Sequence, residues 1–326
     1  MKSIFSSIII LFFFLTTGCD REEIVTPVED GLPPAPPENL RVYYEADGEV
    51  GIEWFYTSTN AVKFLVFRSV NDSSQFKMIE ETSRNYFFDK NLHYDSVYYY
   101  KVSVVNKNNQ KESDPSNIIS ANPVNKYKPL PLRELLVYGR NIDGVLQFEL
   151  NLYPNYESDI LGYEIFKSRT EIFEADSSTM LTFTNSFSFR DTNDVQILTP
   201  YFYKARVVDK GGLKSDFSSV QSDLILDEPE LLFPPDDTTI TEISNFSFRT
   251  ISVPAYYRLE VWLFERMNGA FEIDFFSEKT NSIIDIEFSD YRLERYKNYT
   301  WNVYASTKKD GPYNSKGEYF NFSIVN

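Results

Sequence analysis

Cysteine and histidine are almost absent from this chain of 326 residues, which contains one of each, Cys19 and His93. A disulfide needs two cysteines, so none can form within the chain. A Cys/His zinc site needs more ligands than these two residues supply, and a Ser-His-Asp or Cys-His nucleophile would depend on His93 alone. We therefore expect no metal site, no cofactor and no catalytic triad.

Glycine and basic residues are also scarce. There are 12 glycines against 28 phenylalanines and 23 tyrosines, a bias that favours strands over helices. Acidic residues outnumber basic ones by 48 to 32, which gives a net charge of −16. Nucleic acids and anionic lipid headgroups attract cationic surfaces, so the charge predicts that the chain has no nucleic-acid partner.

The first 18 residues have the pattern of a signal peptide. Lys2 supplies a positive charge, and the chain is almost continuously apolar from Ile4 to Leu15, a shorter run than the roughly 20 residues of a spanning helix. The run ends in Leu15-Thr16-Thr17-Gly18-Cys19, which resembles the lipobox of bacterial lipoproteins. The resemblance implies cleavage before Cys19, acylation of that residue and a membrane partner held through its lipid. The alternative is an ordinary secretory signal with an incidental cysteine.

Residues 19–37 are predicted to form a lipidated tether. Asp20-Arg21-Glu22-Glu23 resembles the surface-export signal of bacterial lipoproteins, although a plain acidic tether is the alternative. Pro33-Pro34-Ala35-Pro36-Pro37 favours an extended conformation, because proline fixes φ and lacks an N–H. These features together predict an outer-membrane lipoprotein exposed at the cell surface.

One strand pattern occurs three times. Residues 98–104, 201–207 and 299–305 each begin with tyrosine and place aromatic or β-branched residues at alternate positions. The repeats lie about 100 residues apart, which is the size of a whole small domain. Short alternating strands with polar turns surround each copy. The pattern predicts three all-β domains, at residues 38–123, 132–227 and 229–326.

The first of these domains resembles a fibronectin type III domain. Trp54 occupies the second expected strand, and Leu92 precedes Tyr98 by the spacing of the family's tyrosine-corner motif. The resemblance implies a buried tryptophan and a tyrosine hydroxyl bonded to nearby loop backbone. Tyr201 and Tyr299 take the same place in the other two domains. The predicted fold class is therefore all-β, with three tandem antiparallel β-sandwiches of fibronectin type III-like form after a cleaved lipoprotein signal peptide.

Aromatic residues at outward strand positions are the candidate binding residues. Period-two alternation places one aromatic outward at the end of the third expected strand of each domain, and others on the neighbouring strand. The candidate binding face consists of Phe67, Tyr99, Phe166, Phe202, Trp262 and Tyr304. Exposed aromatic patches mark binding surfaces. The alternative is that long neighbours such as Lys101 and Arg206 cover these rings.

No residue is predicted to be catalytic. A glycosidase needs two carboxyls in one cleft with separated pKa values, and adjacent acids on a strand point to opposite faces. We therefore expect a non-catalytic cell-envelope lipoprotein that binds an unidentified protein or glycan or serves as a spacer. One alternative is a glycan-acting hydrolase, or an accessory protein, with an unrecognised carboxylate pair. The other is a structural stalk or assembly factor of an envelope complex.

Overall fold

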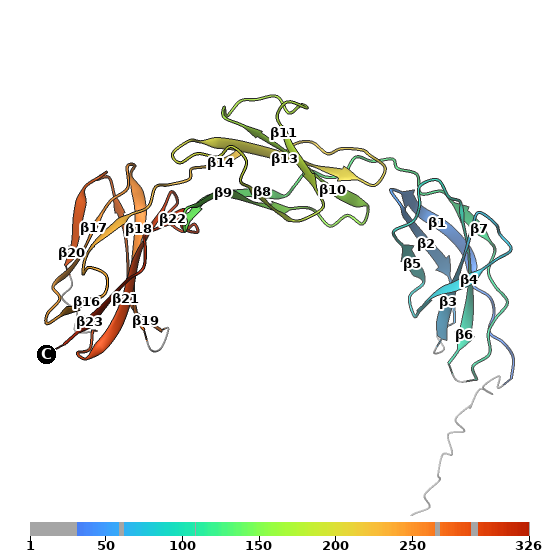
Figure 1. Cartoon of the computed structure of the whole chain (residues 1–326). Coiled ribbons are helices and arrows are strands. Elements are labelled where there is room, and N and C mark those ends of the chain that lie inside the picture. Colours follow the sequence, from blue (N-terminus) through green and yellow to red (C-terminus); the bar gives the residue numbers. More distant parts are fainter. Residues whose placement is uncertain (1–30, 59–61, 108, 265–267, 288–292, 326) are drawn as a thin grey trace, which may run out of the picture. The chain divides into compact units, whose positions relative to one another are not determined.

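The structure is a computed structural model that describes residues 31–58, 62–107, 109–264, 268–287 and 293–325 (Figure 1). Every regular element in these ranges is a β-strand, which confirms the predicted all-β class. The predicted signal peptide and Cys19 lie outside the described residues. The chain packs as two compact units, one containing most of the first sandwich and the other containing the second and third. Within the described ranges, no helix is long and apolar enough to cross a bilayer.

The first sandwich faces a three-stranded sheet, β1-β2-β5, with a four-stranded sheet, β4-β3-β6-β7. Its strands are β1 (Glu38–Ala46), β2 (Glu49–Phe55), β3 (Val62–Val70), β4 (Lys77–Thr82), β5 (Tyr86–Asp89), β6 (Tyr98–Asn106) and β7 (Ile119–Ala121). Trp54 on β2 is buried and packs edge-on against Phe64 on β3, with ring centroids 5.3 Å apart. The tryptophan therefore occupies the core position that the family resemblance implies.

The second sandwich repeats this plan, with β12-β9-β8 opposite β11-β10-β13-β14. Its strands are β8 (Glu134–Ile142), β9 (Val145–Tyr153), β10 (Ile160–Ser168), β11 (Met180–Thr184), β12 (Ser188–Asp191), β13 (Tyr201–Asp209) and β14 (Gln221–Asp223). Phe148 replaces the tryptophan and packs between Tyr201 and Tyr203. The Tyr201 hydroxyl donates to the carbonyl oxygen of Asp194 at 2.7 Å, which is the predicted tyrosine corner.

In the third sandwich, β15-β17-β20 faces a sheet in which β21 and β18 lead to the edge strand β19. Its strands are β15 (Glu230–Phe233), β16 (Thr238–Ile240), β17 (Asn245–Arg249), β18 (Ala255–Leu263), β19 (Asn268–Ser277), β20 (Ile283–Glu287), β21 (Lys297–Ser306), β22 (Ser315–Lys316) and β23 (Phe320–Ile324). Trp301 on β21 fills the core against Phe246 on β17, with ring centroids 5.1 Å apart. The Tyr299 hydroxyl accepts from the Glu294 N–H at 2.6 Å and so forms a second corner.

A β-bulge interrupts the same hairpin in all three sandwiches. In each, the register against the edge strand shifts just before the outward aromatic residue that the sequence singles out. The shifts lie between Val66 and Phe67, between Ile165 and Phe166, and between Val261 and Trp262. Bulges increase local twist and redirect side chains, so these three aromatics sit at the points where each sheet bends.

Candidate functional site

In the first two sandwiches, cationic side chains cover two of the predicted aromatic residues, Phe67 and Phe166. Phe67 and Tyr99 are half-buried, and the Lys101 ammonium lies 5.6 Å from the centre of the Phe67 ring. Phe166 is only 2% exposed, because the Arg206 guanidinium lies 5.5 Å from its ring centre and Phe217 packs on it edge-on. The expectation of an exposed Phe166 is therefore wrong. The alternation was right, but longer neighbours shield the outward ring.

Phe202 is half-buried on β13, opposite Ser168. It lies on the same sheet as Phe166. Because Phe166 is buried, these two rings do not form one exposed platform. The second sandwich therefore offers less aromatic surface than the sequence pattern indicates.

The third sandwich brings the remaining two predicted residues onto one face. Trp262 is half-buried and packs against Tyr319, with ring centroids 5.9 Å apart. Tyr304 is only 8% exposed, so the expectation of an exposed ring is wrong for this residue as well. It packs on Tyr313, with ring centroids 4.5 Å apart, and its hydroxyl lies 3.5 Å from that of Tyr319. Tyr313, Tyr304, Tyr319 and Trp262 therefore form a connected aromatic row.

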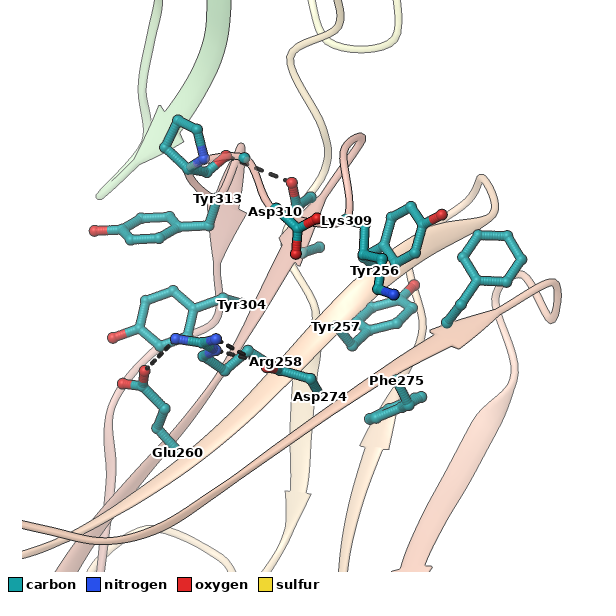
Figure 2. Close-up of a pocket in the computed structure, with 15 residues that line it drawn as sticks. Tyr256, Tyr257, Arg258, Glu260, Asp274, Phe275, Tyr304, Lys309, Asp310 and Tyr313 are labelled. Atoms are coloured by element: carbon teal, nitrogen blue, oxygen red, sulfur yellow. Dashed lines mark hydrogen bonds and ion pairs between the residues drawn. The ribbon is translucent and has the colours of Figure 1, made fainter.

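A cleft with a volume of about 930 Å³ opens beside this row. Its floor is the outer face of β18, β19 and β21, and its wall is the loop that leads to β22 (Figure 2). The lining residues are Tyr256, Tyr257, Arg258, Glu260, Asp274, Phe275, Phe276, Tyr304, Ala305, Ser306, Lys309, Asp310, Gly311, Pro312 and Tyr313. The cleft belongs to the third sandwich, because every one of these residues comes from its strands or loops.

Arg258 lies at the centre of the cleft floor. Strand register places it between Asp274 on β19 and Tyr304 on β21. Its Nε and Nη2 donate to the two Asp274 carboxylate oxygens at 2.7 and 2.8 Å (Figure 2). Its Nη1 lies 3.5 Å from the Glu272 carboxylate and 3.8 Å from that of Glu260. One guanidinium therefore connects three carboxylates.

The two carboxylates that line the floor have pKa values shifted in opposite directions. Hydrogen bonds from Arg258 lower the pKa of Asp274, so this group is ionised throughout the neutral range. Burial raises the pKa of Glu260, and this effect outweighs the attraction of Arg258. Burial also raises the pKa of Tyr304, with a further contribution from Tyr319, so the phenol stays neutral and can donate a hydrogen bond.

Two aromatic pairs border the cleft. Tyr256 and Phe276 are cross-strand partners with ring centroids 4.9 Å apart, and Phe276 is 50% exposed. Tyr304 and Tyr313 form the other pair. The floor between them is polar, so the cleft combines exposed ring surface with a fixed array of charged hydrogen-bonding groups.

Sequence reasoning missed most of these lining residues, although one signal for them was present. Tyr256, Arg258 and Glu260 precede Trp262 at intervals of two, so the same alternation that selected Trp262 also places them outward. Phe276 joins the site through hairpin register, and Tyr313 joins it through a loop. No periodicity encodes either position.

No family model and no curated protein matches the chain. Among solved structures, it is similar to the FN1-FN3 domains of chicken CNTN1, with 13% identity, 90% of this chain and 100% of that chain covered, and a TM-score of 0.37. It is also similar to a structure described as a myokine, with 18% identity, 28% of this chain and 99% of that chain covered, and a TM-score of 0.25. At these TM-scores, the fold assignment rests on the strand order, the core and the tyrosine corners. Across the described ranges, no cluster of three or more His, Cys, Asp or Glu side chains could hold a metal ion.

Proposed function

We propose that this chain is a non-catalytic, lipid-anchored envelope protein whose third sandwich binds a ligand. The observation that carries the binding role is the cleft of about 930 Å³, which lies within the range of about 300–1,000 Å³ typical of ligand sites. The lipobox-like segment ending at Cys19 supports the anchor. The proline-rich tether and the two preceding sandwiches separate the cleft from the anchor along the chain.

Hydrogen–deuterium exchange tests the binding role without assuming a ligand. The mature chain, from Cys19 onward, is compared with and without cell-envelope extract and polymers from the culture medium. We expect protection of amides in β18, β19 and the loop before β22, and weaker protection in the Phe276→Ala variant. Equal exchange under all conditions would contradict the binding role and leave the chain as a spacer.

Lipid anchoring gives a sharp prediction. Replacing Cys19 with serine removes the thiol that would carry the lipid, so we expect the protein to move from the membrane fraction to the soluble fraction. A Thr26→Ser variant, altered in the same tether, should stay with the membrane. Immunoblots of the two fractions make the measurement, and membrane retention of Cys19→Ser would refute the lipid anchor.

Surface exposure is a separate part of the proposal. Protease added to intact cells should release fragments of all three sandwiches, identified by mass spectrometry. The chain would be cut only after the outer membrane is opened if the sandwiches face the periplasm.

A glycan hydrolase is a second candidate, because Glu260 and Asp274 have pKa values moved apart in one cleft. Such a split is typical of an acid and its partner carboxylate. Binding is favoured because Arg258 engages both oxygens of Asp274, which weakens that group as a base or nucleophile. Release of reducing ends from a polysaccharide, abolished in Glu260→Gln, would establish the hydrolase. Absence of turnover by a wild-type chain that binds the polysaccharide would exclude it.

A further inference from the structure

We infer that the cleft of the third sandwich binds a neutral oligosaccharide, and this inference rests on the binding role proposed above. Three observations carry it. The guanidinium on the floor is already occupied by carboxylates, the aromatic row has only part of its surface open, and a second aromatic pair continues the same sheet face.

An anionic ligand finds little free positive charge in the cleft. The lining contains two cations, Arg258 and Lys309, against the carboxylates of Glu260, Asp274 and Asp310. Arg258 directs its Nε and Nη2 donors at Asp274 and its Nη1 at Glu260 and Glu272. An incoming sulfate, phosphate or uronate would have to displace these carboxylates and would meet their repulsion.

A cationic ligand is disfavoured for a different reason. An aromatic cage binds a quaternary ammonium group through open ring faces within about 6 Å of the charge. Tyr304 and Tyr313 lie 4.5 Å apart and cover part of one another. The register partner of Tyr304 is Arg258, whose positive charge therefore lies beside the ring.

A neutral polyol can use what remains. An ionised carboxylate has about four acceptor positions, and Arg258 occupies two of those on Asp274, so sugar hydroxyls can donate to the others. The neutral Tyr304 phenol lies on the other side of Arg258, close to the Tyr319 hydroxyl. The half-exposed Phe276 ring, backed by Tyr256, provides a flat apolar surface for the C–H face of a sugar ring.

The face is long enough for several sugar units. Tyr256 and Trp262 lie six residues apart on β18, a separation of roughly 20 Å at the rise of an extended strand. Tyr319 continues the aromatic row from the cleft toward Trp262, because it contacts the Tyr304 hydroxyl and the Trp262 ring. A linear oligosaccharide could therefore contact Phe276 at one end and Trp262 at the other.

Calorimetric titration of the mature chain tests the inference with stated probes. The probes are neutral malto-, cello-, xylo- and mannohexaose, the anionic hexagalacturonate, and tetramethylammonium chloride. We expect at least one neutral hexaose to bind, its trisaccharide to bind more weakly, and added sodium chloride to have little effect. Phe276→Ala and Trp262→Ala should each weaken binding about tenfold, whereas Phe276→Tyr should preserve it.

The matched control is Tyr156→Ala, which removes a 97% exposed aromatic from the second sandwich and should leave binding unchanged. Equal melting temperatures would show that the variants remain folded. If tetramethylammonium or hexagalacturonate binds, no neutral hexaose binds, and Phe276→Ala weakens that binding, the ligand class is overturned but the binding role stands. No binding of any probe would also overturn the class. The exchange experiment then decides the binding role, which fails only if the cleft gains no protection.

Discussion

Replacing Trp301 with alanine is expected to lower the melting temperature of the third sandwich more than any other single side-chain truncation. Trp301 is fully buried and packs against Phe246 and Phe320, at ring-centroid distances of 5.1 and 6.1 Å. Its indole N–H donates to the carbonyl oxygen of Pro234 at 3.1 Å, so truncation removes both packing and a buried hydrogen bond. A buried Trp→Ala change costs about 3–5 kcal/mol, which corresponds to at least about 6 °C when the second and third sandwiches melt as one unit of about 200 residues.

Trp262→Ala is the matched control, because it removes the same side chain from the same sandwich. Trp262 is half-buried on the outer face, where truncation opens no core cavity, so we expect a shift only a fraction as large. Differential scanning calorimetry of both variants makes the comparison. Similar shifts for the two variants would mean that Trp301 is not the centre of this core.

The strand alternation was predictable because a buried sheet face imposes period two on the chain. The residues that alternate with the outward aromatics on these strands are all buried, namely Phe64, Val66, Tyr163, Ile165, Leu259 and Val261. The tyrosine corners of Tyr201 and Tyr299 follow from the family resemblance, since a buried phenol needs a partner that the preceding loop supplies. Local pattern therefore accounts for the strands and for the packing of each core.

The core of the third sandwich illustrates where pattern was insufficient. The second strand, β17, carries Phe246 and Phe248 and lacks the tryptophan of the first domain. In the structure, Trp301 on β21 occupies the interior against Phe246 on β17. The large ring comes from the other sheet, at the alternating position that Tyr100 and Tyr203 occupy in the first two repeats. The pattern places an aromatic there, but it does not show that this ring takes over the volume of the missing tryptophan.

The candidate site depended on features that alternation does not encode. The burial of Phe166 follows from the reach of Arg206 and from Phe217, which lies in the loop between β13 and β14. The bulge before Trp262 and the hairpin register that brings Phe276 beside Tyr256 are set by strand pairing. These contacts join residues distant in sequence, so no local pattern encodes them.

The connection between the second and third sandwiches is another feature that the sequence did not predict. β22 of the third sandwich pairs in parallel with β8 of the second through Ser315 and Asn141, so the two sandwiches share a sheet. The Asn314 side chain is buried there, and its Nδ2 donates to the carbonyl oxygens of Gly139 and Leu224 at 2.9 and 3.0 Å. A short proline-containing segment between domains gives no sign of such a joint.

Asp223→Asn should disrupt this joint. The buried Asp223 carboxylate accepts four hydrogen bonds. Oδ1 accepts from Thr307 Oγ1 at 2.7 Å and from the Leu224 N–H at 2.9 Å. Oδ2 accepts from Asn314 Nδ2 at 2.8 Å and from the Gly139 N–H at 3.0 Å. An amide places an NH₂ group on one of these two sides, where it faces a backbone N–H in either orientation, so a donor is left buried without an acceptor.

We expect this change to cost about 3 kcal/mol, because hydrogen bonds to charged groups contribute about 1.5–3 kcal/mol and an unsatisfied buried donor adds a further penalty. In calorimetry, the second and third sandwiches of the wild-type chain should melt in one transition, since the shared sheet couples them, whereas Asp223→Asn should give separate or earlier transitions. Asp216→Asn is the matched control, because the Asp216 carboxylate is exposed and pairs with the exposed Lys128 ammonium. If Asp223→Asn melts like this control, the carboxylate does not hold the two sandwiches together, and the cleft of the third sandwich is free to move relative to the second.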